Sequence, residues 1–356
     1  MDLDPIPLAY HVIAGIVDIS GTICNIFTLI FISFTHLGSR TATILFRTQC
    51  SFDGLTCFFA AISLFSSPHI TNFTGWFAVF ICHVWISEYF FKFIELLNVS
   101  NLMWISIDRL FAVYLRSSYK TFQKIEPFIC YTFILCHAII TPLPVVFTVN
   151  YTNGTCTRKG ENTNPAYEQF SVYSWLIFAY LIPSITMVIC YSHVYYFIQK
   201  SLAQSRSTQQ ETYTTEIIKQ SMNTVKSSQQ KCSSSSISSA VSTSSSISQI
   251  KSVLLSITIM CTLFVLSHSY YHIYSLAGLY GAIQYETISI QRRLAVFFTV
   301  IKSSLNPVIL LVSSQQLRKK LIKAYYKFSY RMKLSKKFYP SANTIETSMK
   351  SNDNQD

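Results

Sequence analysis

Charged residues are scarce in this chain: only 12% of its 356 residues are Asp, Glu, Lys or Arg. A soluble domain of this length carries about a quarter. Half of the residues are apolar, so there are too few charges to cover the surface of an ordinary soluble fold. Most of the chain must therefore face either protein or lipid, and the length of the apolar stretches decides between the two.

Seven apolar runs meet the length that a membrane requires. A hydrocarbon core roughly 30 Å thick is crossed by about 20 helical residues. The runs lack the two-residue alternation of barrel strands, so helices are expected. We therefore predict an all-α membrane protein, a seven-transmembrane helix bundle over residues 9–313. The predicted spans are Ala9–Phe34, Ala42–Phe65, Phe77–Tyr114, Pro127–Val149, Phe170–Ile198, Ile250–Leu279 and Leu294–Val312.

Lysine and arginine follow the first, third and fifth runs and crowd the chain after the seventh, whereas the opposite loops hold few. Such an excess is typical of cytoplasmic loops. We therefore expect residues 1–8 to be extracellular and the C-terminus to be cytoplasmic, in a multi-pass protein of the plasma membrane. The net charge of +12 then faces anionic membrane lipid, and no nucleic-acid partner is expected.

Three further regions have a distinct composition. The inner loop over about residues 200–249 is rich in Ser and Gln, which favours disorder. Residues 314–330 place Leu317 and Leu321 at helical spacing among basic residues, which predicts an amphipathic membrane-surface helix; residues 331–356 follow as a cytoplasmic tail. The predicted outer loops contain candidate glycosylation sites at Asn72, Asn150 and Asn153.

Short motifs stand at fixed places in five of the predicted spans. They are, in chain order, Gly21 with Asn25, Asp53 after a further 28 residues, Asp108-Arg109, Pro183 with Tyr191, and Asn306-Pro307. Each motif alone is weak, but their order and spacing together are specific and extend over roughly residues 9–328. In this respect the chain resembles the rhodopsin-like (class A) G-protein-coupled receptor family, as a divergent member.

The resemblance implies a receptor, not an enzyme. It would bind an extracellular ligand, a peptide or a small organic molecule, in the outer half of the bundle and activate a heterotrimeric G protein at the cytoplasmic face. It needs no cofactor, and no metal site is predicted. The resemblance assigns coupling and activation to Asp108, Arg109, Tyr191, Asn306 and Pro307.

A disulfide between Cys82, at the top of the third span, and Cys156, in the second outer loop, is also implied by the resemblance. It fits the oxidising side of the membrane. The step from Cys82 to Arg109 is two residues longer than is usual in the family. This extra length predicts a shift or bulge in the upper half of the third span.

Asp53 is an acid deep within an apolar span, which is costly unless it has a partner. In the family this position helps to hold a sodium ion. Here Lys302 stands five residues before Pro307, where the family usually has Asn. We hypothesise that a Lys302–Asp53 pair replaces the ion, the alternative being that Lys302 points elsewhere. The predicted internal polar pocket comprises Asn25, Asp53, Asn98, Lys302 and Ser303.

Charged and aromatic residues in the outer half are the ligand-binding candidates. Glu88, Lys92 and Glu95 are four and three residues apart and share one helix face; they either bind ligand or neutralise one another. Phe91 stands where amine receptors keep an aspartate, which argues against a biogenic amine. The remaining candidates are His268, Tyr271, His272, Arg292 and Arg293.

Two departures from the family bear on signalling. The sixth span reads Ser267-His268-Ser269-Tyr270 where the family has Cys-Trp-x-Pro, and Leu310 replaces the terminal Tyr of the seventh-span motif. A receptor-like binding or scaffolding protein that does not signal is therefore the main alternative. An opsin is rejected because Val300 occupies the retinal-lysine position. A transporter or membrane enzyme lacks support, because we see no inverted repeat or nucleophile–base arrangement.

Overall fold

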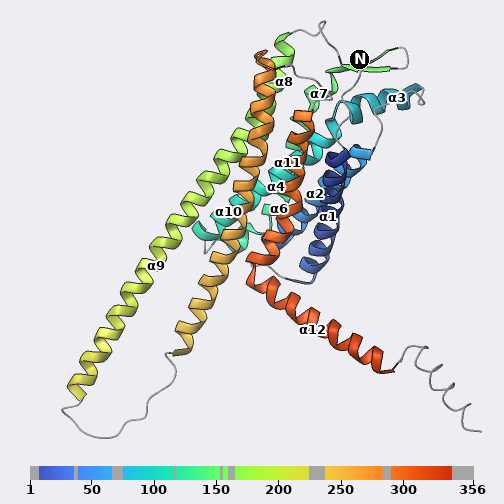
Figure 1. The fold of residues 1–356 in the computed structure, drawn as a ribbon. Helices are drawn as coiled ribbons and strands as arrows, with labels where there is room; N and C mark the ends of the chain where they lie inside the picture. The colour runs from blue at the N-terminus through green and yellow to red at the C-terminus, as the bar shows by residue number, and fades with distance from the viewer. Residues whose placement is uncertain are drawn as a thin grey trace, which may run out of the picture.

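Long helices running between two ends build the fold (Figure 1). The computed structural model describes residues 8–35, 39–65, 75–115, 118–152, 155–158, 165–223, 237–283 and 290–338. The principal helices are α1 (Leu8–Ser33), α2 (Arg40–Phe65), α4 (Tyr89–Tyr114), α6 (Glu126–Ile140), α9 (Ile182–Asn223), α10 (Ile237–Leu279), α11 (Ile290–Ser313) and α12 (Gln315–Phe338). Shorter elements are α3 (Gly75–Ile81), η1 (Cys82–Ile86), α5 (Tyr119–Phe122), α7 (Leu143–Val146), α8 (Pro165–Trp175) and η2 (Leu176–Leu181).

Six of the described helical stretches are long and apolar enough to cross a membrane. They are Leu8–Ser33, Tyr89–Tyr114, Glu126–Val146, Gln169–Ser201, Leu254–Leu279 and Ile290–Ser313. α2 has the same length as α1 but is less apolar, because it buries polar residues such as Gln49 and Asp53. Together with α2, these stretches correspond to the seven predicted spans, the third of them only in part, and the all-α membrane bundle is confirmed.

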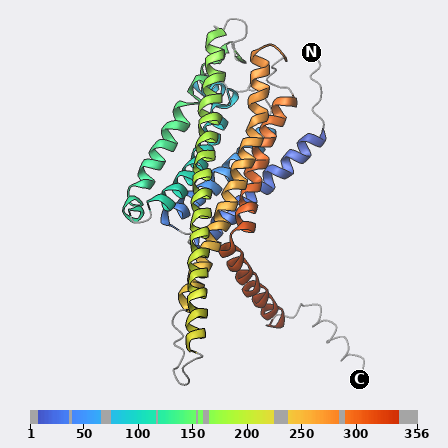
Figure 2. The ribbon, with the colours of Figure 1, turned by 90° about the vertical axis from the view of Figure 1, so that its left-hand side faces the viewer.

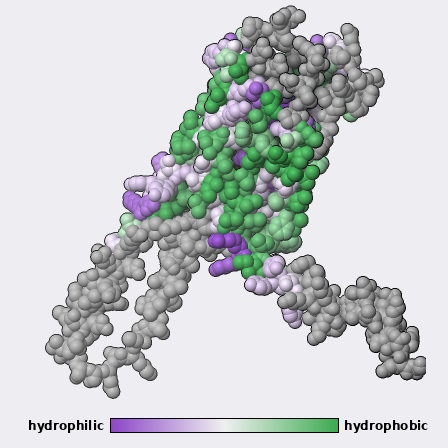
Figure 3. Space-filling view, viewed as in Figure 1, coloured by the Kyte–Doolittle hydropathy of each residue, from purple (hydrophilic) through white to green (hydrophobic). Residues whose placement is uncertain are grey.

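The bundle has an apolar outer surface, and its interior holds buried polar groups beside an apolar core. α1 turns Ile16, Ile23 and Ile30 outward, each more than half exposed, and buries Asp18 and Asn25 on its inner face. The surface of the bundle is mainly hydrophobic between its two ends (Figure 3). Because exposed apolar side chains are stable in lipid and buried polar groups need internal partners, this pattern fits a membrane bundle.

α4 is the central helix. In its most apolar stretch 61% of the residues are buried, against 44% or less in the other candidate spans. Leu96, Leu102 and Ile105 of α4 belong to one apolar core with Met260 and Phe264 of α10. α4 therefore contacts the other helices on most of its circumference.

The third predicted span, Phe77–Tyr114, is wrong as a single helix. α3 and the π-helical turn η1 form a first piece, and α4 begins only at Tyr89. Glu88, between them, has φ 67°, a left-handed conformation that a non-glycine residue adopts at a cost. The predicted shift or bulge in the upper half of this span is thus present, and it takes the form of a break between η1 and α4.

The predicted inner loop, about 200–249, is helical over much of its length. α9 continues to Asn223 and α10 begins at Ile237. The sequence explains the extension, since neither glycine nor proline occurs between Pro183 and Gly278. Once a helix is nucleated, each added residue propagates it with one further hydrogen bond. Both helices project past the bundle at the end where α12 begins (Figures 1 and 2).

α12 leaves the bundle at an angle to α11 (Figures 1 and 2). It continues to Phe338, so the predicted boundary at residue 330 is too early. Leu317 is buried against the apolar core, while Ile322, Tyr325 and Tyr326 are exposed. We call this end of the bundle the α12 end.

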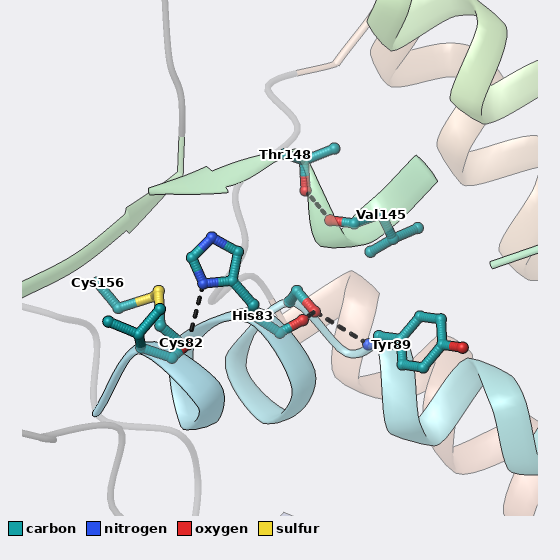
Figure 4. Close-up of a disulfide and its surroundings, with 8 residues drawn as sticks. Cys82, His83, Tyr89, Val145, Thr148 and Cys156 are labelled. Atoms are coloured by element: carbon teal, nitrogen blue, oxygen red, sulfur yellow. Dashed lines mark hydrogen bonds between the residues drawn. A yellow bond between two sulfur atoms is a disulfide. The ribbon is translucent and has the colours of Figure 1, made fainter. Parts of the chain in front are cut away.

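The opposite end carries a small hairpin of β1 (Val149–Thr152) and β2 (Thr155–Arg158), paired antiparallel with Tyr151 opposite Cys156. A disulfide joins Cys156 to Cys82 of η1, with 5.5 Å between the two Cα atoms, and confirms the predicted bond (Figure 4). We call this end the disulfide end.

Gly21 permits the close packing of α1, α2 and α11. A Cβ atom added there would lie 2.8 Å from Cys57 Sγ and 2.9 Å from Ser304 Cβ, closer than real contacts allow. We predict that Gly21→Ala destabilises the protein by about 1–3 kcal/mol and lowers the thermal unfolding midpoint of the purified protein in detergent.

Gly54→Ala is the matched control, because its added Cβ would meet only Asn25 Cβ at 3.3 Å and should cost less. Ser304→Gly should partly restore the Gly21→Ala variant. Equal midpoints for Gly21→Ala and wild type would show that α1 packs differently.

Candidate functional site

A buried carboxylate forms the centre of the bundle's polar interior. Asp53 accepts hydrogen bonds from three side-chain amides: Gln49 Nε2 at 3.0 Å, Asn98 Nδ2 at 2.5 Å and Asn306 Nδ2 at 2.8 Å. The donors come from α2, α4 and α11 respectively. Hydrogen bonds to an ionised carboxylate compensate for its loss of hydration, so the charge on Asp53 links three helices.

Lys302 supplies the positive charge of this network. It is buried on α11, where its Nζ donates to Asn98 Oδ1 at 2.9 Å and lies 3.9 Å from Asp53 Oδ1. The side chain of Asn98 therefore bridges the two charges, since its nitrogen donates to Asp53 while its oxygen accepts from Lys302. Each charged group is within hydrogen-bond distance of Asn98, whereas the direct distance from Lys302 Nζ to Asp53 Oδ1 is 3.9 Å.

Further polar residues extend the network toward α1 and α2. Asn25 Nδ2 donates to the carbonyl of Ser303 at 3.1 Å and so connects α1 to α11. Ser303 Oγ accepts from Asn98 at 3.3 Å. All five residues of the predicted internal polar pocket are thus joined. The sequence reasoning missed Gln49 and Asn101, which hydrogen-bond each other at 2.8 Å.

The pair Asp108–Arg109 lies at the α12 end of α4. Arg109 donates to Asp108 Oδ2 through Nε at 2.9 Å and also through Nη2, while Nη2 donates to Ser39 Oγ at 3.2 Å. Asp108 is almost fully buried and Arg109 is largely so. The arginine is therefore held by its own neighbour and by the residue just before α2.

Tyr119 of α5 completes this arrangement, and the sequence reasoning missed it. Its hydroxyl donates to Asp108 Oδ1 at 2.5 Å and lies 3.1 Å from Ser39 Oγ. Burial, together with the negative charge of Asp108, raises the pKa of Tyr119 to about 12. The tyrosine therefore stays a neutral donor to Asp108 throughout the physiological range.

The three other residues with predicted coupling roles lie elsewhere in the bundle. Tyr191 of α9 shares a hydrogen bond of 2.7 Å with Ser106 of α4, and so links these helices one turn away from Arg109. Pro307 lies inside α11, next to Asn306. Asn306 belongs to the Asp53 network rather than to the Arg109 region.

A second group of charged residues gathers nearer the disulfide end. Glu88 forms an ion pair with Arg292 of α11. Glu95 Oε1 lies 3.0 Å from His268 Nε2 of α10. The Lys92 ammonium lies over the Trp175 ring, 4.4 Å from its centroid, and 5.7 Å from the centroid of Tyr271. Each charge of this segment thus meets a residue of another helix.

Aromatic rings surround these charges. His272 stacks on Tyr180 with 4.8 Å between ring centroids, and the ring centroids of His268 and Phe264 are 4.3 Å apart. We call the whole set the disulfide-end cluster: Glu88, Lys92, Glu95, Trp175, Tyr180, His268, Tyr271, His272 and Arg292. Phe91 instead packs in an apolar group with Val17 and Val296, and the backbone carbonyl of Arg293 accepts a hydrogen bond from Tyr10 at 3.0 Å.

Local hydrogen bonds stabilise the break between η1 and α4. Ser87 Oγ donates to the His83 carbonyl at 2.5 Å and accepts from the Tyr89 backbone N–H at 3.2 Å. The disulfide anchors η1 one turn earlier. These contacts fix the left-handed Glu88 in place, so its carboxylate is directed to Arg292.

The sequence of residues 24–310 matches the profile of the 7 transmembrane receptor (rhodopsin family). The match spans most of the chain and includes the Asp53 network and the Asp108–Arg109 pair. The chain belongs to the rhodopsin-like receptor family. The comparison with curated proteins gives no match.

Within this rhodopsin-like receptor, the departures in the sixth span have a structural counterpart. His268 stands at the family's tryptophan position, buried, with Nδ1 3.0 Å from the Phe264 carbonyl. α10 contains no proline and runs unbroken from Ile237 to Leu279. Leu310, at the family's tyrosine position, is buried in the apolar core.

Of the candidate glycosylation sites, Asn150 is exposed on β1, and Asn72 and Asn153 lie outside the described residues. Asp18 of α1 is a further buried acid that the sequence reasoning did not single out. A hydropathy profile could have identified it, because it is an intramembrane acid like Asp53.

The Asp53 network predicts a specific pattern of stabilities. Asp53→Asn leaves Lys302 buried without its counter-charge and should cost about 3–5 kcal/mol. Lys302→Met should cost less, because three amide donors still compensate Asp53. The double variant should be more stable than Asp53→Asn alone, as measured by thermal unfolding in detergent.

Exchange of sodium for choline in the same assay is the control, and the wild-type midpoint should not change, because Lys302 already supplies the cation. A double variant less stable than Asp53→Asn, or a clear sodium effect, would contradict the Lys302–Asp53 coupling.

Tyr119→Phe tests the contacts of Asp108. Loss of a hydrogen bond to a charged group should destabilise the receptor by about 1.5–3 kcal/mol near neutral pH. In the wild type the raised pKa adds a loss of stability as the pH rises from about 10 to about 12, because the unfolded chain ionises Tyr119 first.

Tyr119→Phe should therefore lose less stability over that alkaline range than the wild type does. Tyr114→Phe is the matched control, since Tyr114 is exposed on the same end of α4. Parallel alkaline curves for Tyr119→Phe and wild type would rule out a buried Tyr119 hydroxyl.

Proposed function

We propose that the chain is a G-protein-coupled receptor of the plasma membrane. The disulfide end faces outward and binds an extracellular ligand in the disulfide-end cluster, and the α12 end faces the cytosol and activates a heterotrimeric G protein. Family membership supports the class of protein. The observation that carries the coupling proposal is the Asp108–Arg109 pair at the α12 end, held by Tyr119 and Ser39.

The distribution of basic residues supports this orientation. Arg47 donates to the carbonyls of Ile32 and Ser33, and Lys320 donates to the carbonyl of Phe34, so basic side chains gather at the α12 end. Cytoplasmic segments have such an excess. The disulfide requires the oxidising side, which is the opposite face.

α12 supports a lipid partner on the same side. Its exposed residues alternate between apolar side chains such as Ile322 and Tyr326 and basic ones such as Lys319 and Lys323. A helix of this composition lies in the plane of an anionic membrane surface. It would hold the α12 end against the cytosolic leaflet.

Binding without signalling is the second candidate function. It is favoured by His268 and Leu310, which replace the tryptophan and tyrosine of the family's sixth and seventh spans. In that case the disulfide-end cluster would still bind ligand, whereas the α12 end would not recruit a G protein.

Arg109→Ala distinguishes the two. In cells with matched surface expression, the wild type should show basal or evoked recruitment of a G protein, and Arg109→Ala should lose it, because the variant lacks the guanidinium at the α12 end. Recruitment measured by energy transfer between receptor and G protein reports this directly.

Lys124→Ala is the matched control, since Lys124 is an exposed basic residue at the same end and should leave recruitment unchanged. Equal recruitment by Arg109→Ala and wild type would reject the role of Arg109. Lack of recruitment by the wild type across all G-protein classes would favour the binding-only function.

A further inference from the structure

A second buried acid, Glu126, lies beside the Asp108–Arg109 pair. It is the first residue of α6 and is only 1% exposed. Its carboxyl group interacts with Asp108 and Arg109 of α4 and with Thr41 of α2. Among the described residues, however, neither Glu126 oxygen and no lone pair of the Thr41 hydroxyl is in a geometry that forms a hydrogen bond. A buried polar group without a partner is uncommon and calls for an explanation.

The basic groups near Glu126 form their hydrogen bonds elsewhere. Arg109 donates to Asp108 and to a serine hydroxyl just before α2. Arg47 of α2 donates to backbone carbonyls at the end of α1, and Arg40 is exposed. An acid in the first turn of a helix is often stabilised by the free N–H groups of that turn, but within the described part of the chain no N–H donates to Glu126.

The charges of this site decide the protonation state of Glu126. Asp108 and Arg109 already neutralise each other. A second ionised carboxylate would add an unbalanced charge out of contact with water, and a buried acid takes up a proton instead. Asp108 is the ionised acid, because it accepts hydrogen bonds from Arg109 and Tyr119. Cys130, the titratable neighbour of Glu126 on α6, adds no charge near neutral pH. Glu126 is therefore the acid that carries the proton.

A protonated Glu126 has an O–H donor, and Asp108 has room to accept it. An ionised carboxylate can accept about four hydrogen bonds. Asp108 Oδ2 accepts two from Arg109, whereas Oδ1 accepts one from Tyr119. One acceptor position thus remains on Asp108, the neighbour with which the Glu126 carboxyl group interacts.

We infer that Glu126 is a neutral carboxylic acid that donates a hydrogen bond to Asp108 and so positions the Asp108–Arg109 pair from α6. When Arg109 leaves Asp108 to contact a G protein, this bond and that of Tyr119 keep Asp108 from becoming an uncompensated buried charge. This second step rests on the proposed function, because it concerns coupling at the same site. The protonation of Glu126 does not require a G protein.

Infrared difference spectroscopy tests the protonation directly. The sample is purified full-length receptor in lipid nanodiscs near neutral pH. The wild type should show the carbonyl stretch of a protonated carboxylic acid, shifted in heavy water, that Glu126→Gln lacks. Asp18→Asn is the control, because it removes a different buried acid and must leave this band in place.

The pH dependence of stability is a second readout. The folded wild type must retain a proton that the unfolded chain releases above about pH 4.3. As the pH rises from about 5 to about 8, the folding equilibrium constant of the wild type should fall about tenfold per pH unit relative to that of Glu126→Gln. Thermal unfolding midpoints of the two proteins should diverge accordingly. An ionised Glu126 would give a constant difference.

The positioning role is tested by G-protein recruitment in cells with matched surface expression. Glu126→Leu lacks a donor to Asp108, so recruitment should fall about tenfold or more, as expected for loss of a hydrogen bond to a charged group. Glu126→Gln should retain most of it, because the amide can donate in place of the acid. Phe128→Leu is the matched control, since Phe128 is exposed on the same turn of α6.

An unchanged carboxylic-acid band in Glu126→Gln, or a constant difference in stability across the pH range, would overturn the protonation of Glu126. Equal recruitment by Glu126→Leu and wild type would overturn its positioning role. If Glu126→Leu does not fold, the two readouts on Glu126→Gln still decide. The expected band together with no recruitment by the wild type would reject only the coupling proposal and would leave Glu126 established as the protonated partner of Asp108.

Discussion

The interior of this receptor depends on two buried charges, Lys302 and Asp53. The side chain of Asn98 connects them, because it accepts a hydrogen bond from Lys302 and donates one to Asp53. In lipid, a charge cannot be hydrated from the side, so it must be balanced within the bundle. Asp53 is balanced by three amides and by Lys302, and these contacts bring together α2, α4 and α11. Non-directional apolar packing fixes the helices less specifically, because lipid tails solvate leucine as well as the protein core does. The polar interior therefore determines which faces of the helices meet.

Much of this arrangement could be predicted from residue types. Span length follows from apolar runs, and Asp53, Lys302 and Asn25 are conspicuous because polar residues in such runs need partners. Gln49 and Asn101 were missed because they carry no charge and belong to none of the family's motifs, although they lie four residues before Asp53 and three after Asn98. Tyr119 was missed for a different reason: its contact with Asp108 depends on the path of α5, which no local pattern determines.

The break at Glu88 shows where sequence reasoning reaches its limit. The extra length between Cys82 and Arg109 indicated an irregularity, but not its form. The disulfide, the Ser87 hydrogen bonds and the Glu88–Arg292 pair together hold the left-handed residue, and these are contacts with η1, β2 and α11. The continuation of α9 past Lys200 has a similar explanation. It follows from the lack of glycine and proline in this part of the sequence, and not from a run of apolar residues.

α4 carries polar residues of both groups, and helix geometry explains how one helix serves so many neighbours. Lys92, Glu95, Asn98 and Asn101 follow one another at steps of three residues. Each such step turns the side chain by about 60° short of a full turn. Successive residues therefore point in turn to Trp175 of α8, His268 of α10, Lys302 of α11 and Gln49 of α2.

This order has a mechanical consequence for the proposed receptor. Rotation of α4 about its own axis would move all four contacts together, whereas a change at any one neighbour is opposed by the other three. The same helix ends in Asp108 and Arg109, which Tyr119 and Ser39 hold at the α12 end. In this chain, which lacks the family's tryptophan and proline in the sixth span, α4 is the described helix that extends from the disulfide-end cluster to the Arg109 region with polar contacts along its whole length.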